Sequence, residues 1–198
     1  MPAQLSLFSQ PKNLPEGFLY EMKFLSADEE VRLVKIIETL PFRQFEFQGF
    51  LGKRRVVSFG WKYDFNDREL RRTEDMPDFL QPLRGRAATL AGLAPDALQH
   101  VLLTEYQPGA SIGWHKDKAV FGEVVGISLL SDCVFRFRRK TGTTWQRASL
   151  KMVPRSAYVL QGPARTEWEH SIPGVESLRY SITFRNLLSA NKEAASSH

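Results

Sequence analysis

Three side chains with metal-binding chemistry occur in two short segments of the chain. In Trp114-His115-Lys116-Asp117, a histidine and an aspartate stand two positions apart. Such residues point to the same side of an extended strand, so both can reach one ion. A third candidate ligand, His170, follows after several predicted strands. Two imidazoles and one carboxylate form a facial triad with open coordination positions, which is typical of non-haem Fe(II) oxygenases.

The histidine and aspartate pair alone is a weak signal, because a chain with 4 histidines and many aspartates can produce it by chance. His115 also fits a surface histidine beside a carboxylate, and His170 fits a histidine satisfied in the core or in a turn.

A predicted strand downstream strengthens the metal hypothesis. Its alternate residues Arg179, Ser181, Thr183 and Arg185 share one face. Two inward arginines are unfavourable in a barrel interior unless they meet anions. A dicarboxylate co-substrate supplies such anions, because a planar guanidinium group binds a carboxylate through two parallel hydrogen bonds.

These segments resemble the AlkB family of 2-oxoglutarate/Fe(II) dioxygenases. The matching pieces, in the family's order, are Glu105-Tyr106-Gln107-Pro108-Gly109, His115-Lys116-Asp117, Trp168-Glu169-His170-Ser171-Ile172-Pro173 and the strand from Arg179 to Arg185. Their ordered occurrence across one region is far more specific than any single motif.

The resemblance implies that His115, Asp117 and His170 bind Fe(II). It also implies that Arg179 pairs with the distal carboxylate of 2-oxoglutarate and that Tyr106 donates a hydrogen bond to this co-substrate. The family's chemistry would then convert O₂ and 2-oxoglutarate to succinate and CO₂ while it hydroxylates a C–H bond of the substrate.

The remaining co-substrate positions show two departures from the family pattern. Thr104 stands where the family often has asparagine, and Ser181 stands where asparagine is common near the arginines. Hydroxyl groups can still donate and accept hydrogen bonds. Thr183 shares the same row, and Arg185 is expected near the metal-binding end of the co-substrate or near the substrate.

The resemblance further implies demethylation of N-alkylated bases in nucleic acid, with release of formaldehyde. DNA repair is the favoured interpretation, and an RNA substrate remains open. Two alternatives stay open as well. The same chemistry could hydroxylate a protein or a small molecule, or a basic jelly roll could bind nucleic acid without turnover.

A segment that interleaves cations and aromatic residues, at residues 49–63, resembles the family's nucleotide-recognition lid in position. An aromatic side chain there could stack on a flipped base while arginines meet phosphates. The alternative is a strand with core aromatics and a solvated basic turn. The candidates for substrate contact are Arg54, Arg55, Phe59, Trp61, Lys116 and Lys118.

A second basic run, at residues 136–140, fits the end of a strand and its turn. It could grip a flanking nucleic-acid strand. It could equally be a hairpin edge whose charges prevent pairing with other sheets.

Helical periodicity and short β-rich segments predict the elements that must hold these residues. A capping box at Ser26-Ala-Asp-Glu29 begins a helix over 27–39, and a second helical pattern covers 78–93. Strands are expected at 44–63, 101–106, 122–130, 134–138, 145–152, 157–161 and 178–185. This order predicts an α+β protein with a double-stranded β-helix (jelly-roll) core, N-terminal supporting helices and a lid-like segment.

Length and composition predict one folded domain with two flanking segments. We expect an extended arm at 1–17, a single oxygenase domain at 18–188 and a flexible tail at 189–198. Within the arm, Gln4-Leu5-Ser6-Leu7-Phe8 resembles the pentapeptide by which bacterial DNA enzymes bind the replicative sliding clamp. Alternatively, Leu5, Leu7 and Phe8 pack on the domain itself.

The charge balance and the cysteine content restrict the partners and the compartment. Lysine and arginine number 27 against 22 acidic residues, a formal charge of 27 − 22 = +5 that fits a polyanionic partner. Cys133 is the only cysteine, which excludes an intrachain disulfide and favours a core position. The chain lacks long apolar runs and a secretory pattern at its start, so we expect a cytoplasmic monomer without membrane spans.

Overall fold

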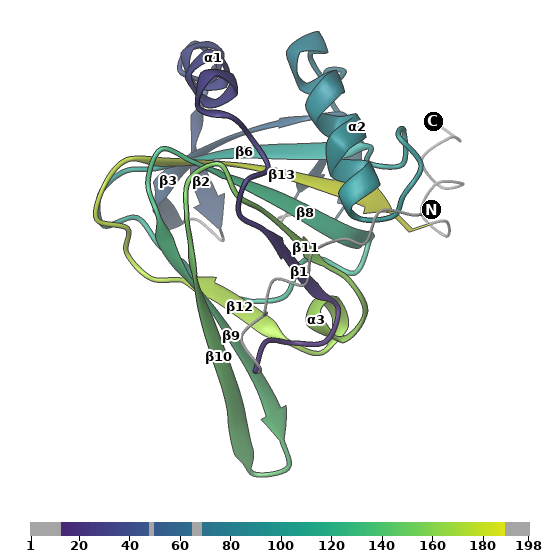
Figure 1. The fold of residues 1–198 in the computed structure, drawn as a ribbon, viewed down its shortest axis with the longest axis vertical. Helices are drawn as coiled ribbons and strands as arrows, with labels where there is room; N and C mark the ends of the chain where they lie inside the picture. The colour runs from purple at the N-terminus through teal and green to yellow at the C-terminus, as the bar shows by residue number, and fades with distance from the viewer. Residues whose placement is uncertain (1–12, 48–49, 65–68, 189–198) are drawn as a thin grey trace, which may run out of the picture.

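Two antiparallel sheets form the core of the computed structural model, which describes residues 13–47, 50–64 and 69–188 (Figure 1). The larger sheet has the order β1 (Phe18–Glu21), β11 (Ala157–Leu160), β8 (Phe121–Leu129), β13 (Arg179–Leu187), β6 (His100–Tyr106), β3 (Phe50–Phe59), β2 (Arg43–Phe47). The smaller sheet has the order β10 (Thr144–Met152), β9 (Cys133–Thr141), β12 (Glu169–Ile172), β7 (Ile112–His115). A separate hairpin pairs β4 (Trp61–Asp64) with β5 (Glu69–Arg72).

Helices cover the outer face of the larger sheet. They are α1 (Ala27–Ile37), the 3-10 turn η1 (Asp78–Leu80) and α2 (Gln81–Leu90) (Figure 1). Ser26 and Glu29 form the predicted capping box, which satisfies backbone donors at the start of α1. Ile37, Leu80 and Ala87 are fully buried in the core between these helices and the sheet.

A second core fills the space between the two sheets and is rich in aromatic rings. Phe18 from the larger sheet contacts Phe135 and Phe137 from the smaller sheet, with ring centroids 6.4 and 5.0 Å away. Cys133 is buried in the same core, as predicted. This inner space also contains the predicted metal and co-substrate residues, so the two sheets hold these residues between them.

The jelly-roll prediction is confirmed, and the differences lie at element ends and in short pieces. Both predicted helices end earlier than their apolar patterns, at 37 and at 90. The short helix α3 (Gly162–Thr166) and the strands β1, β5, β7 and β12 were not predicted, because segments of four or five residues carry little periodic signal. Gln4 to Phe8 and the tail at 189–198 lie outside the described residues.

Among the helices of the described residues, none is long and apolar enough to cross a membrane.

Candidate active site

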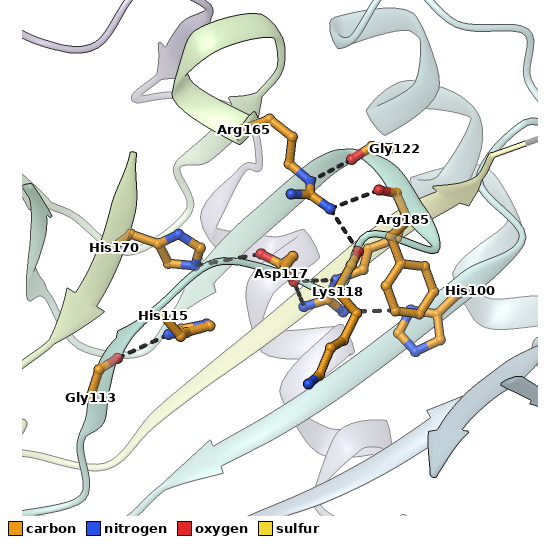
Figure 2. A network of polar contacts seen from close by, with 10 residues as sticks. His100, Gly113, His115, Asp117, Lys118, Gly122, Arg165, His170 and Arg185 are labelled. Atoms are coloured by element: carbon orange, nitrogen blue, oxygen red, sulfur yellow. Dashed lines mark hydrogen bonds and ion pairs between the residues drawn. The ribbon is translucent and has the colours of Figure 1, made fainter. Parts of the chain in front are cut away.

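The three predicted metal ligands converge between the two sheets (Figure 2). His115 ends β7, and it lies directly opposite His170 of β12 in the sheet register. Asp117 follows two residues after His115, and its Oδ2 lies 3.5 Å from Nε2 of His170. One potential ligand atom from each residue lies within 4.8 Å of the others. This donor set and this spacing fit a divalent iron ion.

Neighbouring groups fix the orientation of both imidazole rings. Nδ1 of His115 lies 2.9 Å from the carbonyl oxygen of Gly113, so this nitrogen donates and Nε2 is left as the metal-binding nitrogen. The ring of Phe135 stacks on His170 with centroids 5.3 Å apart and an angle of 16° between the planes. These two contacts therefore orient the rings of His115 and His170.

A buried arginine holds the carboxylate of the triad. Arg185 donates to Oδ1 of Asp117 from Nε and Nη2, at 2.7 and 2.6 Å (Figure 2). Burial by itself would raise the pKa of Asp117, but Arg185, with His170 and His115, lowers it below the usual value. Burial, assisted by His115, lowers the pKa of His170 to about 3. At neutral pH the site therefore offers an ionised carboxylate and a neutral His170, the forms that bind metals.

The other end of the cavity is defined by Arg179, which is 1% exposed. Its Nε donates to Oγ of Ser128 at 3.0 Å, and its guanidinium carbon lies 4.9 Å from the ring centroid of Tyr106. Its Nη1 is buried and has no hydrogen-bond partner among the described residues. A buried cation with an unused donor is unfavourable unless an anion completes it, which fits the distal carboxylate of 2-oxoglutarate.

The structure brings all the predicted co-substrate residues into one cavity with the triad. These residues are Thr104, Tyr106, Arg179, Ser181, Thr183 and Arg185. The sheet register explains this convergence. Arg179 lies opposite Tyr106, and Ser181 lies opposite Thr104, so their side chains share the inner face.

Tyr158 of β11 also lines the cavity, and sequence reasoning missed it. It lies opposite Gly126 of β8, and a Cβ atom built on Gly126 would be only 2.2 Å from the Tyr158 ring. The missing side chain at Gly126 therefore lets the tyrosine ring lie across β8. A glycine inside the apolar strand pattern was the signal that could have indicated a close approach.

Arg165 of α3 is the second residue that sequence reasoning missed, and it organises the loop after Asp117. Its guanidinium donates to the carbonyl oxygens of Lys118, Phe121 and Gly122 at 2.7 to 2.8 Å (Figure 2). The side chain is 9% exposed, so these three bonds replace its lost hydration. No local pattern in the sequence connects a residue of α3 with that loop.

Two of the predicted substrate contacts, Arg55 and Phe59, lie on the helix-covered face of the larger sheet. Arg55 pairs through two bonds of 2.7 Å with Glu105, on the face that the helices cover. Phe59 is 4% exposed and belongs to the core beneath those helices. Both side chains therefore point away from the cavity, because side chains alternate along β3 and odd-numbered positions face the helices.

The other predicted substrate contacts lie closer to the cavity or beside it. Arg54 lies opposite the cavity residue Tyr106, and its guanidinium carbon is 3.9 Å from the ring centroid of Phe45. Nζ of Lys118 lies 5.2 Å from the ring centroid of Tyr63 on β4, which links the lid-like segment to the triad loop. Tyr63 was not among the predicted aromatic contacts.

Lys116 and Trp61 are held by their neighbours. Nζ of Lys116 donates to the carbonyl oxygen of Thr166 at 3.0 Å. Trp61 is partly buried in the β4–β5 hairpin, opposite Arg72. Trp61 is not among the residues that line the cavity.

A jelly roll with two histidines, one carboxylate and an inward arginine defines a mononuclear iron oxygenase that uses a 2-oxo acid. The family model of the 2OG-Fe(II) oxygenase superfamily matches residues 17–185. The chain therefore belongs to this superfamily of oxygenases, which use Fe(II), 2-oxoglutarate and O₂, and it is similar to AlkB-type members.

Individual relatives are distant in sequence. The chain is 26% identical over 193 residues to the "Alkylated DNA repair protein ALKBH8 homolog" of Arabidopsis thaliana, a match that covers 85% of this chain and 54% of that protein. It is 28% identical over 192 residues to the "Uncharacterized protein L905" of Acanthamoeba polyphaga mimivirus, covering 89% and 87% of the two chains. The solved structure of OsALKBH1 superposes with a TM-score of 0.71 at 16% identity, over 87% of this chain and 98% of that one.

Proposed function

We propose that this chain demethylates N-methylated bases in nucleic acid by oxidation, with DNA favoured and RNA as the second candidate. Its His115, Asp117 and His170 would hold Fe(II), and Arg179 would hold the distal carboxylate of 2-oxoglutarate. The observation that carries the nucleic-acid substrate is a group of three cations beside the triad and its cavity. Lys116 and Lys118 flank Asp117 in the sequence, and Arg54 is opposite the cavity residue Tyr106.

Once bound, Fe(II) and 2-oxoglutarate would supply the chemistry by which O₂ hydroxylates an N-methyl group, with 2-oxoglutarate converted to succinate and CO₂; the unstable hydroxymethyl group then leaves as formaldehyde. The protein's own contribution is to position and to shield. Arg185 fixes the Asp117 carboxylate, and Gly113 fixes the tautomer of His115. Burial keeps His170 neutral at physiological pH. Arg179 orients the co-substrate, because its unused Nη1 donor can bind one carboxylate oxygen.

The name of the Arabidopsis relative supports a nucleic-acid substrate, since it describes an alkylated DNA repair protein. The net charge of +5 points in the same direction, because phosphate contacts dominate nucleic-acid affinity. The competing function is hydroxylation of a protein or a small molecule at the same site. Hydroxylation of a protein or a small molecule needs no cations beside the triad. Replacement of Lys116 or Lys118 therefore distinguishes the two candidate functions.

The test is incubation with Fe(II), 2-oxoglutarate and oligonucleotides that carry 1-methyladenine or 3-methylcytosine, in DNA and in RNA form, followed by mass spectrometry. We expect loss of the methyl group with formation of one succinate per methyl removed. An Asp117→Ala variant should lose both products. Succinate formation without methyl loss on every oligonucleotide would refute the proposal.

A second experiment separates the enzyme from a non-catalytic nucleic-acid binder. Lys118→Ala should raise the KM for the oligonucleotide and leave the KM for 2-oxoglutarate unchanged, because Lys118 lies outside the co-substrate cavity. His170→Ala should abolish turnover and leave binding of an unmodified oligonucleotide intact. A His170→Ala variant with full demethylase activity would contradict the assigned iron site.

A further inference from the structure

The outer face of the smaller sheet carries arginine and tryptophan side chains, whereas its inner face packs in the aromatic core. Along β9, Phe135 and Phe137 point inward and are buried, so Arg136 and Arg138, which alternate with them, point outward. The sheet register places Arg147 of β10 opposite Arg138. It also places Trp145 opposite Lys140 and Ser149 opposite Arg136, so these side chains share the outer face.

Four of these outward side chains form a continuous stack, which we call the Trp–Arg strip: Trp145, Arg138, Trp114 and Arg136. The guanidinium carbon of Arg138 lies 4.5 Å from the ring centroid of Trp145 and 4.6 Å from that of Trp114. The guanidinium carbon of Arg136 lies 5.0 Å from the ring centroid of Trp114. Such contacts hold aromatic planes and cations in fixed alternation.

The strip lies in a positively charged surrounding. Glu169 lies opposite Arg138 and forms an ion pair with it. The exposed Arg147 and Lys140 on the same face have no ion-pair partner among the residues that the structure describes. Trp145 remains 40% exposed, which leaves indole surface open for stacking. Charge and exposed aromatic surface together match a nucleic-acid strand better than an acidic peptide, which would use only the charge.

The strip is connected to the active site through the strands that carry the triad. Trp114 precedes His115 on β7, which is the edge strand of the smaller sheet. Glu169 likewise precedes His170 on β12. From β7 to β10 the strip crosses three interstrand spacings, about 14 Å. A strand whose base occupies the triad cavity can therefore pass around the β7 edge and continue over the strip.

We propose that the Trp–Arg strip, with Arg147 and Lys140, binds single-stranded nucleic acid that flanks the target base. An unpaired base stacks on Trp145, while the phosphates contact Arg147 and Lys140. Single strands are selected because only an unpaired base exposes its face to an indole ring. The inference rests on the proposed nucleic-acid substrate, and it adds a second binding surface outside the catalytic cavity.

The test is fluorescence anisotropy with an unmodified, labelled single strand of about twelve nucleotides, within the usual range of site sizes for such surfaces. Trp145→Ala should weaken binding at least about five-fold, the lower limit for loss of one stacked base. Arg147→Glu should weaken binding and reduce the salt dependence of log K by about 0.7 or more, as for loss of one phosphate contact. Arg32→Glu is the matched control, because Arg32 is an exposed arginine on α1, which packs on the larger sheet.

Abasic strands and short substrates make the test specific. On a strand without bases the effect of Trp145→Ala should disappear, and the effect of Arg147→Glu should persist. Unchanged affinity in both variants, or equal losses in Arg32→Glu, would overturn the inference.

Demethylation of a methylated trinucleotide should be the same in all variants, because Trp145 and Arg147 lie on β10, three strands away from the triad strand β7. If the trinucleotide is demethylated and longer strands bind equally to all proteins, the strip is refuted and the proposed function stands. If strands bind through the strip and no methyl group is lost, the strip stands and the demethylase proposal fails.

Discussion

Replacement of Arg179 by methionine tests the assignment of the co-substrate site by a change in stability. Methionine has a long, flexible, apolar side chain and can fill much of the buried space. The free wild-type protein contains a buried cation whose Nη1 has no partner among the described residues. An uncompensated buried charge destabilises a fold by about 3–5 kcal/mol. Against this, the variant loses the bond to Ser128, about 1.5–3 kcal/mol, and the contact with Tyr106, up to about 2 kcal/mol.

Taken together, these ranges predict that Arg179→Met without ligand should differ in stability from the wild type by between about −2 and about +3.5 kcal/mol. Arg165→Met is the matched contrast, because Arg165 is also a buried arginine but has carbonyl partners for three bonds. Its loss should destabilise the protein by about 3 kcal/mol or more, since each bond to a charged group contributes about 1.5–3 kcal/mol. In a protein of this size, that lowers Tm by about 6 °C or more.

Binding of 2-oxoglutarate, in contrast, should stabilise the wild type more than it stabilises Arg179→Met. With Mn(II) in place of Fe(II) to prevent turnover, 2-oxoglutarate at about 100 times its Kd should stabilise the wild type by about 2.7 kcal/mol. This corresponds to a Tm increase of about 5–11 °C. Arg179→Met should bind at least about ten-fold more weakly, and the same ligand concentration then contributes at most about 1.4 kcal/mol.

The assay is thermal unfolding across a titration of 2-oxoglutarate. An Arg179→Met protein that is destabilised as much as Arg165→Met, and yet keeps the full ligand-induced increase in Tm, would refute the reasoning.

Three further predictions concern the metal site, the contact between Gly126 and Tyr158, and the Arg55–Glu105 ion pair. His170→Ala should abolish binding of Fe(II) or Mn(II) in isothermal calorimetry while the far-UV circular dichroism spectrum stays unchanged; metal binding at wild-type affinity would contradict the triad. Gly126→Ala should lower the free energy of unfolding by about 1–3 kcal/mol in urea titration, because the new Cβ overlaps the Tyr158 ring, and Tyr158→Ala in the same chain should relieve the effect. The pKa of Glu105 is lowered below its usual value, and the hydrogen bond from Arg55 is the largest cause of this shift. The Arg55–Glu105 pair therefore stabilises the fold above about pH 4.5, and this stabilisation is lost as the pH falls through the lowered pKa of Glu105. Urea titrations from pH 7 to pH 3 should show a smaller loss of stability for Glu105→Gln than for the wild type, and equal losses would exclude this ion pair as a contributor.

Local patterns in the sequence were sufficient for much of the fold and for the core of the candidate site. Alternation along residues 179–185 places four polar side chains on one face in any strand, whatever the strand packs against. The Ser26 capping box likewise begins α1 from local hydrogen bonds alone. A facial triad was indicated by the two-residue spacing of His115 and Asp117 together with the order of the motifs, without any information on tertiary contacts.

Only the tertiary structure decided which alternate face of β3 meets the cavity. The alternation in residues 54–59 separates two sets of side chains, but it does not determine which set faces the cavity. Pairing with β6 directs Arg54 inward and Arg55 toward the helices. The contacts of Arg165 with the loop after Asp117, and of Tyr158 with Gly126, join segments that are far apart in the chain. Such contacts follow from sheet register and from packing between layers, which no local pattern of residue types contains.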